Sequence, residues 1–216
     1  TINNIGTANQ AGVAGDANIG NNDTGSIDLD GSVYNVAGDF NVASDDAANQ
    51  TFSASTDIIS TGDVSFSSIV LDVLNVDLEI IATGQNIVVG NISAINFNNN
   101  NTATRGNVTL STGVAAGEII STGGMTDVGD VSLTAGPNTI SLSGIYTPAS
   151  FLAVTNVELD SDVEIDTSAA NGNITFQDEV NRSAAANVDF TLNAGTGNIQ
   201  FDQAVGDGTT VGGAFT

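Results

Sequence analysis

The stretch that decides the fold is Asn187–Val205, which reads NVDFTLNAGTGNIQFDQAV. Two runs in which apolar and polar residues alternate are joined in it by a Gly-Thr-Gly corner at residues 195–197. Alternation with a period of two, bounded by glycine, is typical of half-buried β-strands. The stretch therefore predicts two short strands that meet at a tight corner.

The same pattern recurs through the whole chain. A glycine is followed within two residues by Asp or Asn, and then by an alternating run. Successive copies are 22 to 25 residues apart, except for one step of 43 that is close to two steps. A constant period in the twenties is typical of solenoids, in which each repeat forms one coil. The copies begin at Gly15, Gly38, Gly62, Gly84, Gly106, Gly129, Gly172 and Gly197.

Each repeat contains several short alternating runs and no amphipathic helical pattern. Glycine tolerates tight corners, and Asn or Asp hydrogen-bonds to the backbone at bends. Leucine-rich repeats have a similar length, but their helical half and their leucine signature are missing from this sequence. We therefore expect an all-β fold, a parallel β-helix (β-solenoid) of about nine coils of 22–25 residues. Residues 1–216 would form one such domain, either by itself or as a segment of a longer repeat protein.

A pair of Ig-like β-sandwiches is the alternative fold, since strands spaced about 8–12 residues apart also suit a sandwich. The common period of the glycine corners disfavours it.

Three regions depart from that period. The polar run Asn98–Asn101 is expected to form a loop at a corner, and the missing repeat between Pro137 and Ala170 should lie near residue 151. The run Glu118–Gly123 is out of phase and should belong to a different arm of its coil.

The composition limits the possible partners. The net charge is -23, and Arg105 and Arg182 are the only cationic side chains. Binding to nucleic acid or to an anionic membrane surface is therefore not expected, because phosphate contacts require Lys and Arg. No run approaches the ~20 apolar residues of a membrane span, so no membrane insertion is expected. The chain has no Cys and no His, which excludes disulfides and the catalytic pairs built on these residues.

The segments Val163–Val180 and Val188–Val205 share an alternating run, a corner of small residues, Gly-Asn-Ile-x-Phe and a tail that ends in Val. In this pattern the chain resembles the filamentous-haemagglutinin-like, β-strand-repeat surface proteins of bacteria. The resemblance is clearest over roughly the last 60 residues. It implies export, a right-handed parallel β-helix, and a role in adhesion or in extracellular fibres. It implies no catalytic residues.

The best candidate for a binding site is Val157–Asp166, which reads VELDSDVEID. On one straight strand its carboxylates would lie on the outward face, about 6.6 Å apart. Together with carboxylates of adjacent coils they could bind Ca²⁺, which takes six to eight oxygen ligands at about 2.4 Å. The alternative is a solvated acidic face that discourages lateral aggregation. The candidate metal ligands are Glu158, Asp160, Asp162, Glu164 and Asp166.

Enzymatic activity is not expected, although parallel β-helices host polysaccharide hydrolases and lyases. Asp28/Asp30 and Asp45/Asp46 are the only paired carboxylates considered for glycoside hydrolysis. Neither pair has a neighbouring cation in the sequence that would separate two pKa values or stabilise developing charge. Carbohydrate binding or polysaccharide degradation on a face of the solenoid therefore remains the alternative function, and catalytic and cofactor residues are not predicted.

The last residues begin another alternating run at Val211 and Phe215, so we expect an unfinished coil there. The open end of a solenoid is a sheet edge that can pair with another strand. We therefore expect a non-enzymatic, extracellular or cell-surface structural protein that builds a fibre or an adhesin. Its partner would be a second copy stacked head to tail, or further repeats of the same chain, with extracellular polysaccharide as a possible ligand.

Overall fold

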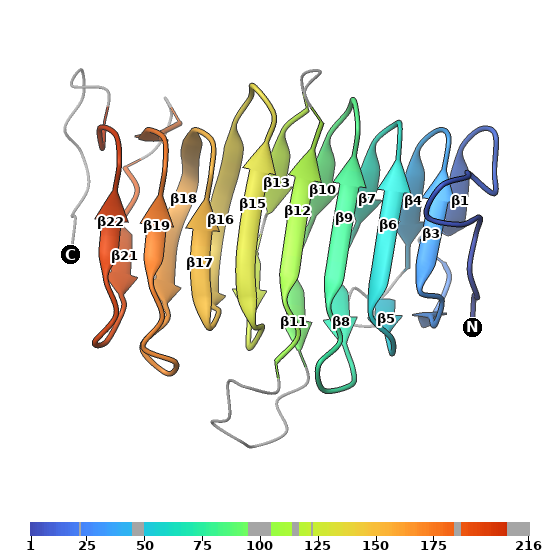
Figure 1. Cartoon of the computed structure of the whole chain (residues 1–216), viewed down its shortest axis with the longest axis horizontal. Coiled ribbons are helices and arrows are strands. Elements are labelled where there is room, and N and C mark those ends of the chain that lie inside the picture. The colour runs from blue at the N-terminus through green and yellow to red at the C-terminus, as the bar shows by residue number, and fades with distance from the viewer. Residues whose placement is uncertain are drawn as a thin grey trace.

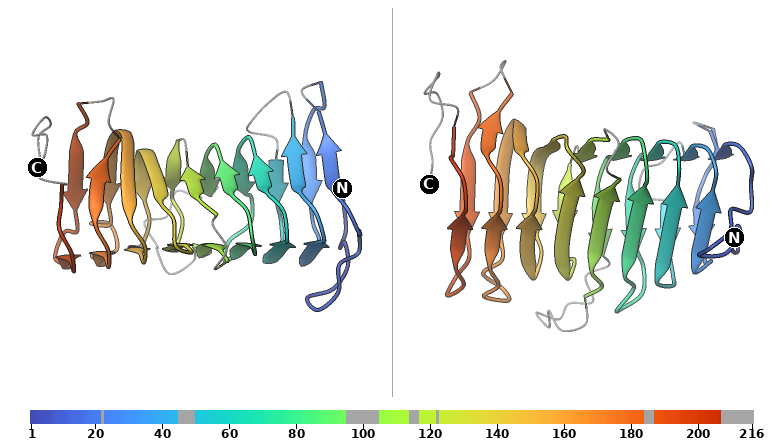
Figure 2. Two further views of the ribbon diagram at one scale, coloured as in Figure 1. Left: turned by 90° about the horizontal axis from the view of Figure 1, so that it is seen from above. Right: turned by 45° about the horizontal axis from the view of Figure 1, so that its top comes forward.

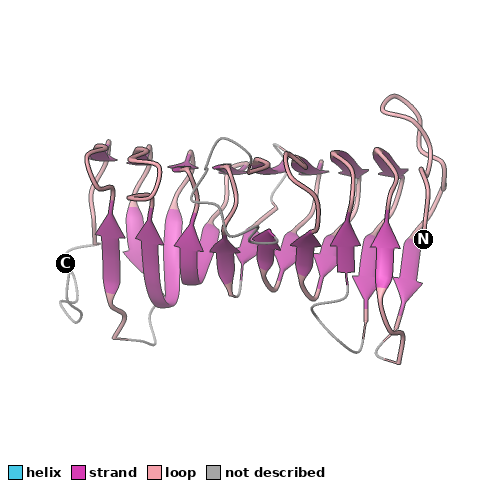
Figure 3. Cartoon of the chain, turned by 90° about the horizontal axis from the view of Figure 1, so that it is seen from below, coloured by secondary structure: helices cyan, strands magenta, loops and turns pink. Residues whose placement is uncertain are grey.

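The computed structural model describes residues 1–21, 23–44, 50–94, 105–113, 117–121, 123–183 and 187–206. These residues form a rod of stacked coils, with the N-terminus at one end and β22 (Ile199–Phe201) at the other (Figure 1). The described secondary structure consists of strands joined by loops and turns, without a helix (Figure 3). Accordingly, within these ranges no helix has the length and apolarity needed to cross a bilayer. The expected all-β fold is confirmed.

Each coil contributes strands to three faces of the rod. The first face is formed by β1 (Ala17–Gly20), β4 (Phe40–Ala43), β7 (Val64–Phe66), β10 (Ile87–Val89), β13 (Ile119–Ser121), the first halves of β16 (Ile140–Thr147) and β18 (Val157–Asp166), and β20 (Val180–Arg182). The second face is formed by β2 (Ile27–Leu29), β5 (Gln50–Phe52), β8 (Ile69–Leu71), β11 (Ile92–Ala94), β14 (Gly124–Thr126), the second halves of β16 and β18, and β21 (Phe190–Asn193).

The third face is a separate eight-stranded sheet. Strands pair with their counterparts in the preceding and following coils, and the named strand pairs are parallel. The coil is right-handed (Figures 1 and 2), as are about 98% of crossovers between parallel strands. The sheet consists of β3 (Val33–Val36), β6 (Thr56–Ser60), β9 (Leu78–Ala82), β12 (Val108–Thr112), β15 (Asp130–Ala135), β17 (Ser150–Ala153), β19 (Ile174–Phe176) and β22 (Ile199–Phe201).

The number of coils is somewhat lower than the expected nine, because β3 and β22 are the ends of an eight-stranded sheet and are therefore seven turns apart. Coil length also varies more than 22–25 residues. The paired positions Ile87 and Ile119 are 32 residues apart, whereas Ile140 and Val157 are 17 apart. The long coil contains the Asn98–Asn101 run, which lies outside the described residues. The short one arises because β16 passes from the first face to the second without a loop.

The two predictions about irregular repeats are confirmed. Phe151 pairs with Val131 and with Ile174, so the repeat missing from the glycine pattern is β17. Ile119 of the out-of-phase run pairs on the first face with Ile87 and Ile140. By contrast, the similar runs after Asp57 and Glu79 form β6 and β9 on the third face.

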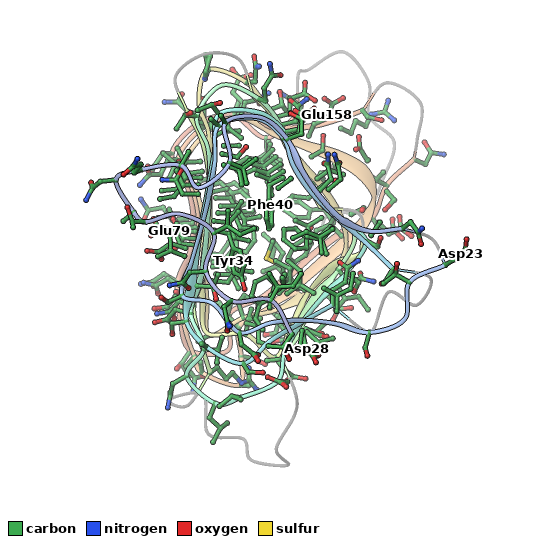
Figure 4. All side chains as sticks on the ribbon, turned by 90° about the vertical axis from the view of Figure 1, so that its right-hand side faces the viewer. Asp23, Asp28, Tyr34, Phe40, Glu79 and Glu158 are labelled. Atoms are coloured by element: carbon green, nitrogen blue, oxygen red, sulfur yellow. The ribbon has the colours of Figure 1, made fainter. Side chains whose placement is uncertain are left out.

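Inward side chains form continuous apolar columns along the rod. Viewed along its axis, Tyr34 and Phe40 point into the interior, whereas Glu79 and Glu158 point outward (Figure 4). Aromatic rings cluster in two places, with Phe151, Phe176 and Phe190 in the C-terminal one, where neighbouring ring centroids are 5.7 Å apart. Each such buried side chain contributes about 1.5–3 kcal/mol of transfer free energy. The core therefore has no single centre and extends from coil to coil.

Residues 1–13 form an irregular layer over the first coil. Isolated bridges connect Ile2 with Leu29 and Ile5 with Tyr34. The hydroxyl of Tyr34 fastens this layer, because it donates to the Ile2 carbonyl oxygen at 2.7 Å and accepts from the Gly31 N–H at 2.8 Å. Burial raises the pKa of Tyr34; the Gly31 hydrogen bond opposes the rise and the charge of Asp30 adds to it.

Candidate functional site: the coil corners and the C-terminal edge

A row of side chains connects successive coils at the corner before the first face. The backbone N–H of Asp39 donates to Asp16 Oδ1 at 3.0 Å, and that of Asp63 donates to Asp39 Oδ1 at 2.9 Å. The N–H of Asn86 and that of Glu118 continue the row, donating to Asp63 Oδ1 at 2.9 Å and to Asn86 Oδ1 at 3.0 Å. Each coil from that of Asp16 to that of Asn86 thus offers an oxygen to the next one.

A second row follows the corner before the third face. The N–H of Asn107 donates to Asp77 Oδ1 at 2.7 Å, and the N–H of Asp130 donates to Asn107 Oδ1 at 2.8 Å. Near the C-terminus, the N–H of Asn198 donates to Asn173 Oδ1 at 3.0 Å. In both rows the side-chain oxygen belongs to the earlier coil and the N–H to the later coil. These hydrogen bonds therefore all have the same orientation along the stack.

The first row explains two of the glycines that precede an Asp, Gly38 and Gly62. A Cβ at Gly38 would overlap Asp16 Oδ1, and one at Gly62 would overlap Asp39 Oδ1. The side chain of one coil therefore occupies the space that glycine leaves in the next. The first three glycine corners of the sequence precede the first face, whereas those at Gly106 and Gly197 precede the third face. The repeated motif therefore marks two different corners.

The acidic strand β18 differs from the expected straight strand. Its register with β16 shifts between Leu142 and Gly144, which are paired with Leu159 and Val163. The strand turns a corner there, and the intervening residues Asp160–Asp162 are exposed. The prediction that five carboxylates share one face is therefore wrong. Glu158 lies on the first face, Asp160 and Asp162 lie at the corner, and Glu164 and Asp166 lie on the second face.

Two of these carboxylates have structural hydrogen bonds. Asp162 Oδ1 accepts from the N–H of Asp189 at 2.8 Å. Asp166 Oδ1 accepts from the N–H of Ser168 at 2.8 Å, and its Oδ2 accepts from Asn193 Nδ2 at 3.3 Å. Among the described residues, no group of three or more acidic, imidazole or thiol side chains is arranged to hold a metal ion.

Calcium binding by these carboxylates stays a prediction that a melting experiment tests. A specific site filled at about 100 times its Kd would add about 2.7 kcal/mol, or roughly 5–10 °C in Tm for a chain of this size. Because the carboxylates are divided between two faces and a corner, we expect Ca²⁺ and Mg²⁺ to change Tm equally after EDTA treatment. A rise with Ca²⁺ alone would contradict this expectation.

Of the carboxylate pairs considered for glycoside hydrolysis, only Asp28 and Asp30 lie within the described residues. Asp28 lies in β2, and its Oδ1 accepts from Thr51 Oγ1 of the next coil at 2.7 Å. Asp30 lies beyond the end of that strand and is exposed. Asp45 and Asp46 lie outside the described residues. Asp28 thus has the same role as the corner residues, which is to connect one coil to the next.

A shallow polar groove runs along the corner before the third face. It consists of two adjoining concavities of about 360 and 340 Å³ that share Asp77 and Asn107. Glu79 and Arg105 also line it. Such groups can hydrogen-bond to a polyhydroxylated ligand. The described aromatic rings, however, are buried or partly buried, so the groove has no exposed ring on which a sugar could stack.

Sequence reasoning missed the role of Arg105. Its Nη2 lies 3.3 Å from Asp127 Oδ1, and its Nη1 donates to the carbonyl oxygen of Thr147 at 3.3 Å. Asp127 and Thr147 belong to the two following coils. Arg105 therefore connects three coils. The signal in the sequence was that a cationic side chain is rare in this acidic chain.

The C-terminal edge exposes residues that are core residues elsewhere. Ile199 is 44% exposed, whereas Ile174, its partner in the preceding coil, is 0% exposed. Val205 is 43% exposed, and its partner Val180 is 1% exposed. The edge residues expected from the sequence, Val211 and Phe215, lie outside the described residues. Ile199 and Val205 define what we call the C-terminal edge.

Comparison with known proteins found no matching family model, no matching curated protein and no matching solved structure. The resemblance to filamentous-haemagglutinin-like surface proteins therefore stays a prediction from the sequence. The class defined by the fold itself is the right-handed parallel β-solenoid.

Proposed function

We propose that the chain is a non-enzymatic structural protein of the cell surface or extracellular space, and that it builds a fibre or adhesin by stacking coils end to end. The partner at the C-terminal edge is the first coil of a second copy, or further repeats of the same kind. The observation that carries the proposal is the exposure of Ile199 and Val205, whose partners Ile174 and Val180 in the preceding coil are buried.

A sheet edge such as β22 can take a further strand. A further coil would pair with β22, the last strand of its sheet, and would cover the apolar column that ends at Ile199. The interface would repeat the contacts inside the rod, where several coils offer corner oxygens to the next one. A contact between unlike ends does not close on itself and therefore generates a filament.

Location outside the cell is supported by the resemblance of Val163–Val205 to exported repeat proteins. Polysaccharide binding in the groove around Asp77 and Asn107 is the second candidate function, favoured by the polar lining of that groove. The absence of an exposed aromatic ring among its described lining residues makes it the weaker of the two.

The proposal predicts the effect of a polar residue at the edge. Ile199→Asn should weaken self-association at least about tenfold, a loss of about 1.4 kcal/mol per contact, because a polar amide would then be buried at the interface. The Tm of the isolated subunit should change little, since Ile199 is 44% exposed. Sedimentation velocity over a concentration series measures the association.

Ile145→Asn is the matched control. Ile145 is 50% exposed but lies on β16, in the interior of the stack and facing outward from the second face. It should leave self-association unchanged. Equal association of the wild-type protein and both variants would contradict stacking through the C-terminal edge.

A further inference from the structure

The acidic charge is concentrated at the two ends of the rod. Residues 1–77 contain 11 Asp and Glu and no cationic side chain, and residues 157–216 contain ten and Arg182. The middle section, residues 78–156, contains four and Arg105. Because the described coils stack in sequence order along the axis, the described residues of these sections form successive sections of the rod, with nine, four and nine acidic residues (Figure 1).

Head-to-tail stacking brings the two acidic sections together. The net charges of the end sections are -11 and -9, against -3 in the middle. Many of these carboxylates are on the surface, including Asp160 and Glu164 close to the C-terminal edge. Like charges brought close together repel across water, and the repulsion depends on the ionic strength because salt screens it.

We infer that ionic strength controls the end-to-end assembly of this protein, with the acidic end sections acting as an electrostatic barrier that salt lowers. The inference rests on the proposed stacking function and names its regulation. At about 0.01 M salt the screening length is about 30 Å, several times the ~4.8 Å between coils, so charges on several coils of each partner repel. At about 0.1 M it falls to about 10 Å, and only the coils nearest the contact still interact.

The test measures association by sedimentation velocity while NaCl is raised from about 0.01 M to about 0.15 M. The association constant should rise at least about tenfold over this range. The double variant Asp160→Asn with Glu164→Gln should reach the same association at lower salt, because it removes two charges near the C-terminal edge. Among the described residues, neither side chain has a hydrogen-bond or ion-pair partner.

The matched control removes two charges from the middle of the rod. Glu79→Gln with Glu118→Gln changes the net charge by the same amount, and both side chains are exposed. Its salt dependence should stay close to that of the wild-type protein. If both double variants shift the salt dependence equally, total charge rather than charge at the ends controls assembly, and the inference is wrong.

Two further outcomes distinguish the inference from the function on which it rests. Association that is equally strong at all salt concentrations would overturn the inference and leave stacking intact. Monomers at every salt concentration would overturn both. Calcium chloride provides the last comparison: at equal ionic strength it should raise the association constant only modestly more than NaCl does. Assembly that requires calcium at any ionic strength would show control by coordination and would also overturn the inference.

Discussion

Gly106→Ala is expected to destabilise the protein by about 3 kcal/mol, which lowers Tm by roughly 6–12 °C. A Cβ at this position would overlap the carbonyl oxygen and carbonyl carbon of Val76 in the preceding coil. Both atoms belong to the backbone, so the clash can be relieved only by separating two coils. Thermal unfolding followed by far-ultraviolet circular dichroism measures the change.

Gly15→Ala is the control, because Gly15 precedes Asp16 in the first regular coil as Gly106 precedes Asn107 in a later one. A Cβ there would meet no atom within 4 Å. The substitution should be neutral or stabilising by up to about 1 kcal/mol, since alanine reduces the freedom of the unfolded chain. If the two variants melt at the same temperature, close packing of coil corners does not limit the stability of the stack.

Phe176→Ala is expected to cost about 3–5 kcal/mol. The side chain is fully buried in β19, and its ring contacts those of Phe151, Phe190 and Phe201 at centroid distances of 5.1 to 5.7 Å. Its loss opens a cavity at the point where three coils meet. Chemical denaturation with urea measures the free energy of unfolding.

Phe201→Ala removes the same kind of ring from the last coil. Phe201 stacks on Phe176 with an interplanar angle of 7°, but it is only partly buried. We expect about half the cost of Phe176→Ala, because less apolar surface returns to water. A larger cost for Phe201 than for Phe176 would contradict a core that is built up coil by coil.

The sequence was sufficient to predict the fold class and the position of most coils. Alternating runs predicted the strands, and the interval between Gly129 and Gly172 correctly predicted β17 near Phe151. These predictions depend only on side-chain alternation and on the spacing of corners. Both are properties of short segments of sequence, so they can be recognised without knowing the contacts between coils.

The phase of the repeats and the geometry of the acidic strand could not be predicted in the same way. Gly-Asp and Gly-Asn precede the first face in some coils and the third face in others, so the motif alone does not identify the face that follows. In β18 the alternation continues through the bend near Asp160, and nothing in the local pattern marks that bend. Contacts between coils, such as that of Arg105 with Asp127, depend on residues far apart in sequence.

The most direct test of the proposed function is electron microscopy of the intact protein at about 0.15 M salt, combined with diffraction from aligned specimens. End-to-end stacking predicts unbranched filaments about as wide as a single rod, with strands across the axis and a spacing of about 4.8 Å along it. Dispersed single rods at every protein concentration would contradict the proposal that the C-terminal edge binds a second copy.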